Sequence, residues 1–145
     1  MTPARGTVAA GVLALAVLGA ACGGGSHGAS GPPTALPLPG AGPIPVSQLT
    51  SAASQMCGIV AQSRSDPAHV LDPFYRGPHD TLHLLAAVAH ASHPTQAQSL
   101  LDVMLTYEGD IAATPPPAST GAAAAALLGA VDTTLSVLGV PPPAC

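Results

Sequence analysis

The sequence predicts an all-α protein, a small antiparallel four-helix bundle that follows an extended N-terminal segment and is closed by a disulfide bond. Three observations indicate this class. Apolar residues recur at helical spacing in four separate segments after residue 46. Short runs rich in proline separate these segments, as in bundles with short connections. Cys57 and Cys145 stand far apart in this region, whose length of roughly 100 residues suits one domain with a modest core.

The first predicted helix runs from about Gln48 to Ser65, with Ser47 as its capping residue. Asp66-Pro67 ends it, because proline cannot continue a helix. Residues 66–78 contain three prolines and a glycine, so we expect one short turn of helix followed by a loop. The apolar residues at helical spacing on this first helix are Leu49, Ala53, Met56 and Val60.

The second predicted helix starts at Gly77-Pro78 and runs to about Ser92. Proline suits the first helical position, and Asp80 places a negative charge near the positive end of the helix dipole. His93-Pro94 then changes the chain direction, and a third helix follows from about Thr95 to Ala112. Its apolar stripe consists of Ala97, Leu100, Leu101, Met104 and Ile111.

The fourth predicted helix runs from about Ser119 to Leu138, after a run of three prolines, and stops at Gly139. Its apolar residues at helical spacing are Leu127, Leu128, Val131, Leu135 and Leu138. We expect it to lie antiparallel to the first helix.

Residues 1–21 have the layout of a secretory signal peptide. Arg5 precedes an apolar run from about Gly6 to Leu18, and small residues follow. The run is too short to span roughly 30 Å of hydrocarbon as a helix. We therefore expect the protein to be exported.

The segment Leu18-Gly19-Ala20-Ala21-Cys22 resembles the lipobox of bacterial lipoproteins, although Gly19 stands where these proteins prefer Leu, Val or Ile. The resemblance implies a diacylglyceryl lipid with palmitate-type chains on Cys22 and anchoring at the extracytoplasmic face of the cell membrane. Residues 22–45 then form an extended tether without packed structure, and residues 46–145 form the helical domain. The alternative is cleavage near Ala20 or Ala21, which releases a secreted protein.

Lipidation of Cys22 leaves Cys57 and Cys145 as a pair, and an oxidising compartment favours a disulfide bond between them. Closing a loop of about 88 residues stabilises a fold by roughly 4 kcal/mol through lost loop entropy. An antiparallel fourth helix ends near Gln48, about 14 Å along the axis from Cys57. The proline-rich tail from Val140 spans a similar distance.

The charge of the chain limits its partners. Behind Cys22, Arg64 and Arg76 are the only basic residues, and they stand against all seven Asp and Glu. Binding to nucleic acid and to anionic lipid surfaces depends on clustered Lys and Arg. We therefore exclude nucleic acid as a partner, and expect the lipid anchor in the membrane and another envelope protein or the cell wall as contacts.

Four of the six histidines, His79, His83, His90 and His93, lie within 15 residues. On a helix the first three fall within about 40° of one another, opposite the apolar residues. His79 and His83 are one turn apart and can ligate one Zn or Cu ion, with Asp80, Tyr75 or His69 as possible further ligands. The alternative is that they are polar residues on a solvated face.

The stretch from Ser92 to Gln98 resembles the Tyr-x-x-x-His-Pro segment of mycobacterial haemophores and related small secreted helical proteins. In that family Tyr and His near the His-Pro element are associated with haem. Only His93 carries over, because the position four residues before it is Ala89. Tyr75 and Tyr107 are the candidates for the missing phenolate, and haem is the alternative cofactor.

Asp102, Glu108 and Asp110 make one side of the third predicted helix acidic, and we interpret this side as a solvated face because no calcium-binding loop accompanies it. The sequence also lacks a Gly-x-Ser-x-Gly elbow, a P-loop, a dinucleotide fingerprint and a His-Glu-x-x-His helix. We therefore expect no enzymatic activity. The sequence favours a non-enzymatic binding or interaction module of the cell envelope, with metal or haem binding through the histidines as the alternative.

Overall fold

The computed structural model describes residues 31–145. The predicted signal peptide and the predicted lipidation site at Cys22 lie outside the described residues. The described part is mostly helical and carries a short two-stranded antiparallel sheet. In chain order its elements are β1 (Ala35–Leu36), β2 (Ile44–Pro45), α1 (Val46–Ser65), the 3₁₀-helix η1 (Pro67–His69), α2 (Leu71–Arg76), α3 (His79–His90), α4 (Pro94–Ala112) and α5 (Thr120–Val137).

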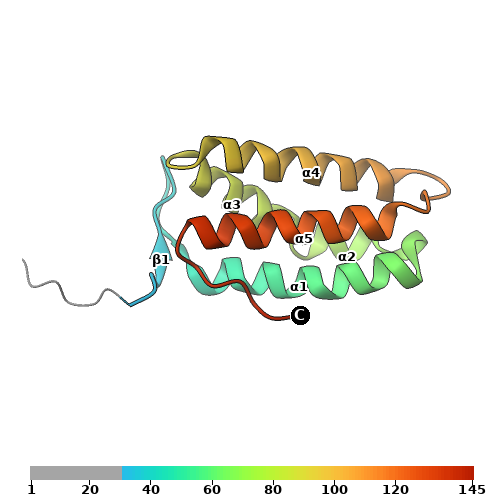
Figure 1. Ribbon diagram of the computed structural model, residues 1–145, viewed down its shortest axis with the longest axis horizontal. Coiled ribbons are helices and arrows are strands. Elements are labelled where there is room, and N and C mark those ends of the chain that lie inside the picture. The colour runs from blue at the N-terminus through green and yellow to red at the C-terminus, as the bar shows by residue number, and fades with distance from the viewer. Residues whose placement is uncertain (1–30) are drawn as a thin grey trace, which may run out of the picture.

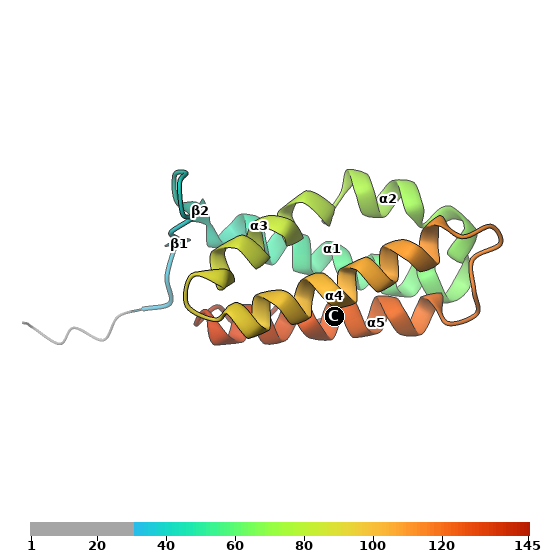
Figure 2. The same cartoon turned by 90° about the horizontal axis from the view of Figure 1, so that it is seen from above.

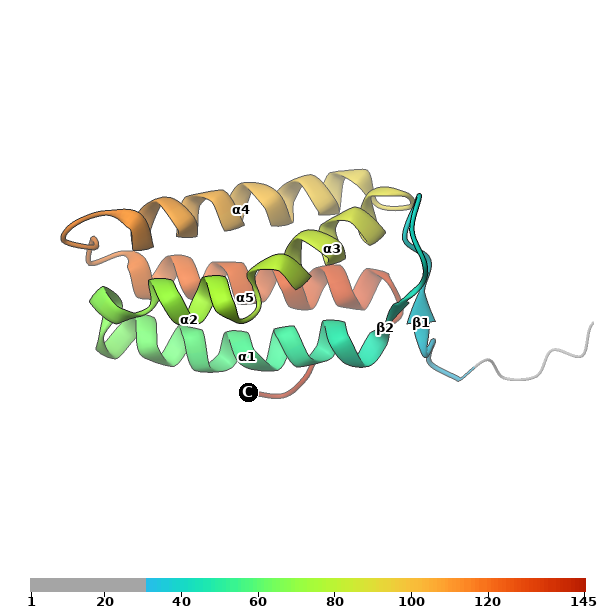
Figure 3. The same ribbon diagram turned by 180° about the vertical axis from the view of Figure 1, so that it is seen from behind.

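The long helices lie side by side along one axis (Figure 1). α5 lies between α1 and α4 and packs against both of them. α2 lies along α1, and α3 leads from there toward α4, against which it packs (Figure 3). The side chains between the helices form one core whose largest fully buried members are Tyr107, Phe74, Leu49, Met56, Leu82, Leu85, Leu100, Met104, Leu127 and Leu135.

The prediction of a mostly helical domain is confirmed, but the segment between the first two predicted helices differs from the expected turn and loop. It contains both η1 and α2, so the described residues hold five α-helices and the simple four-helix description is not confirmed. Pro73 lies in the first turn of α2, where a proline is tolerated. Gly77 then separates α2 from α3, and a Cβ at this position would lie 2.7 Å from the Pro73 carbonyl oxygen.

The start of α1 differs from the predicted start at Gln48. The helix begins at Val46, and Ser47 makes no capping hydrogen bond. The backbone N–H of Val46 instead donates to the carbonyl oxygen of Thr34 at 2.9 Å. The chain preceding the helix therefore satisfies one of the first four N–H groups, which have no partner within the helix.

The expectation of an unpacked tether is wrong for residues 31–45. Ala35 pairs with Pro45 and Leu36 with Ile44 in an antiparallel hairpin. The side chains of Leu36 and Ile44 are only 8% and 5% exposed. Prolines alternate here with large apolar residues. Proline restricts the unfolded chain, so ordering this segment loses less conformational entropy, and burial of the apolar side chains against the helix ends offsets that loss.

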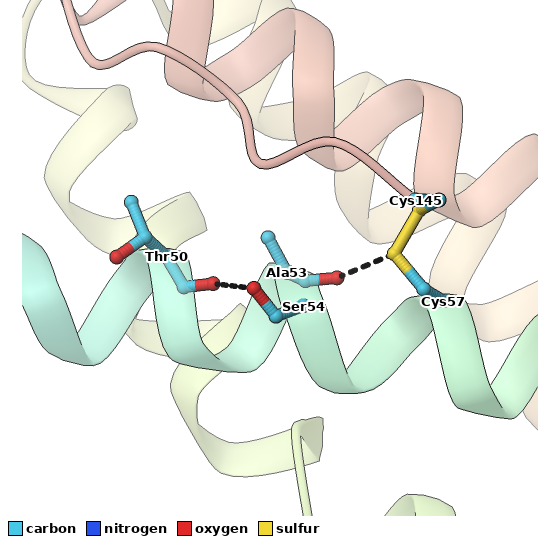
Figure 4. Close-up of a disulfide and its surroundings, with 5 residues drawn as sticks. All are labelled: Thr50, Ala53, Ser54, Cys57 and Cys145. Atoms are coloured by element: carbon cyan, nitrogen blue, oxygen red, sulfur yellow. Dashed lines mark hydrogen bonds between the residues drawn. A yellow bond between two sulfur atoms is a disulfide. The ribbon is translucent and has the colours of Figure 1, made fainter.

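The predicted bond between Cys57 and Cys145 is confirmed, with a Cα–Cα distance of 5.5 Å. Gly139, with a φ of +74°, turns the chain at the end of α5. The N–H groups of Gly139 and Val140 donate to the carbonyl oxygens of Ser136 and Leu135, the pattern of a Schellman motif. The tail then runs back along α1 to Cys57, whose sulfur lies 3.8 Å from the carbonyl oxygen of Ala53 (Figure 4).

Within the described residues, α5 alone is long and apolar enough to cross a membrane by length and composition, with a mean hydropathy of 1.3. Its apolar character has a structural use in the fold. Leu127, Val131 and Leu135 are fully buried where α5 packs on α1 and α4 (Figure 2).

Candidate metal centre

His79 and His83 occupy the first turns of α3, and Glu108 lies in α4, which packs against α3. Residues four apart on a helix share a face, which places the two imidazoles beside each other with ring centroids 4.7 Å apart. Glu108 reaches the same place from the neighbouring helix. One potential ligand atom from each of the three residues lies within 4.8 Å of the other two.

His79 is held by aromatic neighbours and by a carboxylate. Its ring makes an edge contact with Phe74 and a tilted contact with Tyr75, at centroid distances of 5.5 Å and 4.6 Å. The side chain is only 18% exposed. Its Nδ1–H donates to Oδ1 of Asp80 at 2.9 Å, since a carboxylate can only accept. These contacts set the orientation of the ring, with Nδ1 directed at Asp80.

Nε2 of His79 faces Glu108. With the proton on Nδ1, the neutral ring has a lone pair on Nε2, and this atom lies 3.1 Å from Oε1 of Glu108. Oε1 is buried and receives no hydrogen bond of acceptable geometry. Two acceptors at this distance repel each other unless a cation, either a proton or a metal ion, lies between them.

The donor set fits a borderline transition metal. Two imidazole nitrogens and one carboxylate oxygen are ligands that Zn²⁺ and Cu²⁺ accept, whereas Ca²⁺ requires six to eight oxygens. Ligands about 2.0–2.1 Å from a tetrahedral Zn²⁺ are roughly 3.4 Å from each other. The separation of 3.1 Å between His79 and Glu108 is close to that edge length. His83 is exposed, so its side chain is free to rotate toward the ion.

Asp80 has a different position from the one expected of a metal ligand. Its hydrogen bond to Nδ1 of His79 places it behind the imidazole, on the side away from Glu108. Carboxylates in this position fix the orientation of a ligating histidine and raise its basicity. Asp80 therefore lies behind His79, and Glu108 is the carboxylate that lies next to both imidazoles.

The interpretation of Glu108 as part of a solvated acidic face is wrong. Its side chain is only 20% exposed because α3 covers that side of α4. The sequence contains a weak signal of this position, since Met104 and Ile111 are core residues that flank Glu108 on adjacent turns. The expectation that His79 faces solvent is also wrong, because Phe74 and Tyr75 of α2 cover its ring.

The other predicted residues lie away from this cluster. His69 hydrogen-bonds both carboxylate oxygens of Asp66 at 2.9 Å, and this pair raises the pKa of His69. His90 is exposed near the far end of α3. Among the described residues, the cluster that could hold a metal ion consists of His79, His83 and Glu108 and includes neither His69 nor His90, which lies about two turns of α3 beyond His83.

The two residues considered for haem, His93 and Tyr75, are not brought together. Tyr75 contacts His79 at the start of α3, and His93 precedes α4, so the length of α3, about 17 Å, lies between them. Burial and the negative charge of Glu108 raise the pKa of Tyr75, which favours the neutral phenol. Tyr107 is buried and shares a 2.9 Å hydrogen bond with Ser63.

No known protein family, curated protein or solved structure matches this chain significantly.

Proposed function

We propose that this chain is a non-enzymatic module of the cell envelope that binds a divalent transition metal, Zn²⁺ or Cu²⁺, through His79, His83 and Glu108. The observation that supports this most strongly is the approach of Glu108 Oε1 to within 3.1 Å of His79 Nε2 with no hydrogen bond to satisfy it. A metal ion between these atoms converts a repulsive contact between two acceptors into two coordinate bonds.

The aromatic and carboxylate contacts of His79 also support metal binding. When the ring is neutral and its Nδ1–H donates to Asp80, Nε2 is available as a ligand. Phe74 and Tyr75 restrict the ring to one orientation, so little side-chain entropy is lost on binding. The His79 ligand is therefore positioned before the ion binds.

Isothermal titration of the purified full chain with Zn²⁺ and Cu²⁺ tests the proposal. We expect one ion per chain, and no measurable binding after the double substitution His79→Ala with His83→Ala. His90→Ala is the matched control, because it removes an exposed histidine from the same helix. Equal binding by the double variant and the parent chain would refute the assignment.

We also propose that the module is carried on a lipid anchor at Cys22. The lipobox-like segment supports this, and so does the disulfide bond, which uses two of the three cysteines and leaves only Cys22. A disulfide of this kind suits the oxidising environment outside the cytoplasm. Labelling with a radioactive fatty acid in the host should modify the parent chain but not Cys22→Ser, and undiminished labelling of that variant would exclude the anchor.

We further propose that the helices form a four-column bundle in which α2 and α3 share one column. Their succession along one side of the molecule supports this (Figure 3).

A further inference from the structure

An apolar groove of about 330 Å³ lies between α3 and α4, next to the proposed metal centre. Ala86, Ala97 and Leu101 form its apolar lining, and Leu38 from the turn of the hairpin contributes to one wall. His83 lines this groove and also belongs to the metal-ligand cluster. The groove and the proposed centre therefore share a side chain, and a molecule in the groove would lie beside an ion bound there.

The charges around the groove define what it can hold. Neither of the two arginines in the described residues lines it, and its polar lining groups are His83, His90 and Gln98. A negatively charged group therefore finds no arginine or lysine to pair with. A divalent ion bound by one carboxylate and two neutral imidazoles retains a net charge of about +1 and supplies that partner.

The ligand count leaves room for such a group. Three protein ligands leave at least one position open on a tetrahedral ion, as in zinc sites that accept water or substrate. The side chain of His83 is exposed and lines the groove, so an ion bound to it would be next to the groove. Asp80 and Glu108 place two carboxylates around His79, which disfavours ligands with more than one negative charge.

We propose, on the basis of the metal function above, that the groove binds a small monocarboxylate with an apolar body. Its carboxylate oxygen coordinates the metal ion beside His83, and its hydrocarbon part covers Ala86, Ala97 and Leu101. From His83 to His90 the groove follows about 10 Å of α3, which is enough for a chain of several carbons.

Titration of hexanoate and acetate into the full chain, with and without bound Zn²⁺, tests this inference. Hexanoate should bind the zinc-loaded chain at least about tenfold more tightly than acetate does, because only hexanoate buries a hydrocarbon chain. It should bind the metal-free chain at least tenfold more weakly. Ala87→Phe places a large ring at an exposed position of the groove and should abolish hexanoate binding without loss of zinc. Ala126→Phe, at an exposed position of α5, is the matched control and should bind both zinc and hexanoate as the parent chain does.

The outcomes separate this inference from the metal function. Normal zinc binding without hexanoate binding, or with equal affinities for hexanoate and acetate, overturns the groove assignment and leaves the metal site intact. Equal affinity of hexanoate for the zinc-loaded and metal-free chains also overturns it, since the ion then plays no part. Failure of zinc to bind overturns both proposals.

Discussion

Nε2 of His79 lies 3.1 Å from Oε1 of Glu108, across the contact between α3 and α4. When the ring is neutral and its Nδ1–H donates to Asp80, neither atom has a proton to offer the other, so the contact is favourable only with a proton or a metal ion between them. The same two residues therefore provide the most direct tests of the site.

Glu108→Gln should separate metal binding from folding. Gln keeps the size of the side chain but replaces a charged ligand with a weak neutral one, so metal affinity should fall by at least about 100-fold. Its amide N–H₂ can donate to Nε2 of His79, so unfolding in urea with a chelator present should show no loss of stability beyond about 1 kcal/mol. A variant that binds zinc as tightly as the parent would contradict the role of Glu108.

Asp80→Ala should weaken metal binding without removing a ligand. Loss of the hydrogen bond to Nδ1 frees the ring and lowers its basicity, which typically costs about 10–100-fold in metal affinity. Asp72→Ala is the control, because Asp72 is an exposed carboxylate of α2 that pairs with Arg76. Titration calorimetry of both variants should show a change for Asp80→Ala alone.

Gly77→Ala and Gly129→Ala should shift the stability of the domain in opposite directions. A Cβ at Gly77 meets the backbone oxygen of Pro73 at 2.7 Å, so the junction between α2 and α3 must move, at a cost of about 1–3 kcal/mol. The movement should also weaken metal binding, because α2 carries the aromatic contacts of His79.

Gly129 lies exposed in α5 with open space around it, and Ala there should stabilise the domain by about 0.5–1 kcal/mol. A loss of stability in Gly129→Ala would show that the space around α5 is not open.

Asp132→Asn should stabilise the domain at neutral pH but not in acid. Burial raises the pKa of Asp132, and its Oδ1 receives no hydrogen bond. Because the pKa is higher in the folded state, the favourable contribution of Asp132 is complete below its unfolded pKa and is lost as the pH rises through the folded pKa. The gain from Asn should be below about 1 kcal/mol at pH 7, since solvent screens this partly exposed group, and should vanish below about pH 3. Denaturation of Asp102→Asn, which changes an exposed carboxylate of α4, should show no such difference between the two pH values.

Cys57→Ser with Cys145→Ser should lower the free energy of unfolding by roughly 4 kcal/mol, the loop entropy released in the unfolded chain. The bond lies on α1, away from the groups that hold His79 and Glu108. Zinc affinity of the folded fraction should therefore remain unchanged, and a loss of affinity would show that the tail supports the metal centre.

The sequence by itself determined the local parts of this structure. Apolar spacing and proline breaks predict helices close to α1, α3, α4 and α5, because these signals act within a few residues. The spacing of His79 and His83 places them on one face of a helix for the same reason. The link between Cys57 and Cys145 was predicted from the odd number of cysteines, from the expected lipidation of Cys22 and from the reach of the tail.

Only the tertiary structure decided which groups meet across helices. Met104 and Ile111 only hint that Glu108 shares the core side of α4, and its contact with His79 depends on how α3 lies over α4. The hairpin of residues 35–45 likewise forms because the helix ends offer an apolar surface to Leu36 and Ile44. Both contacts join segments far apart in the chain, and their energy comes from burial, which a periodic pattern within one segment does not encode.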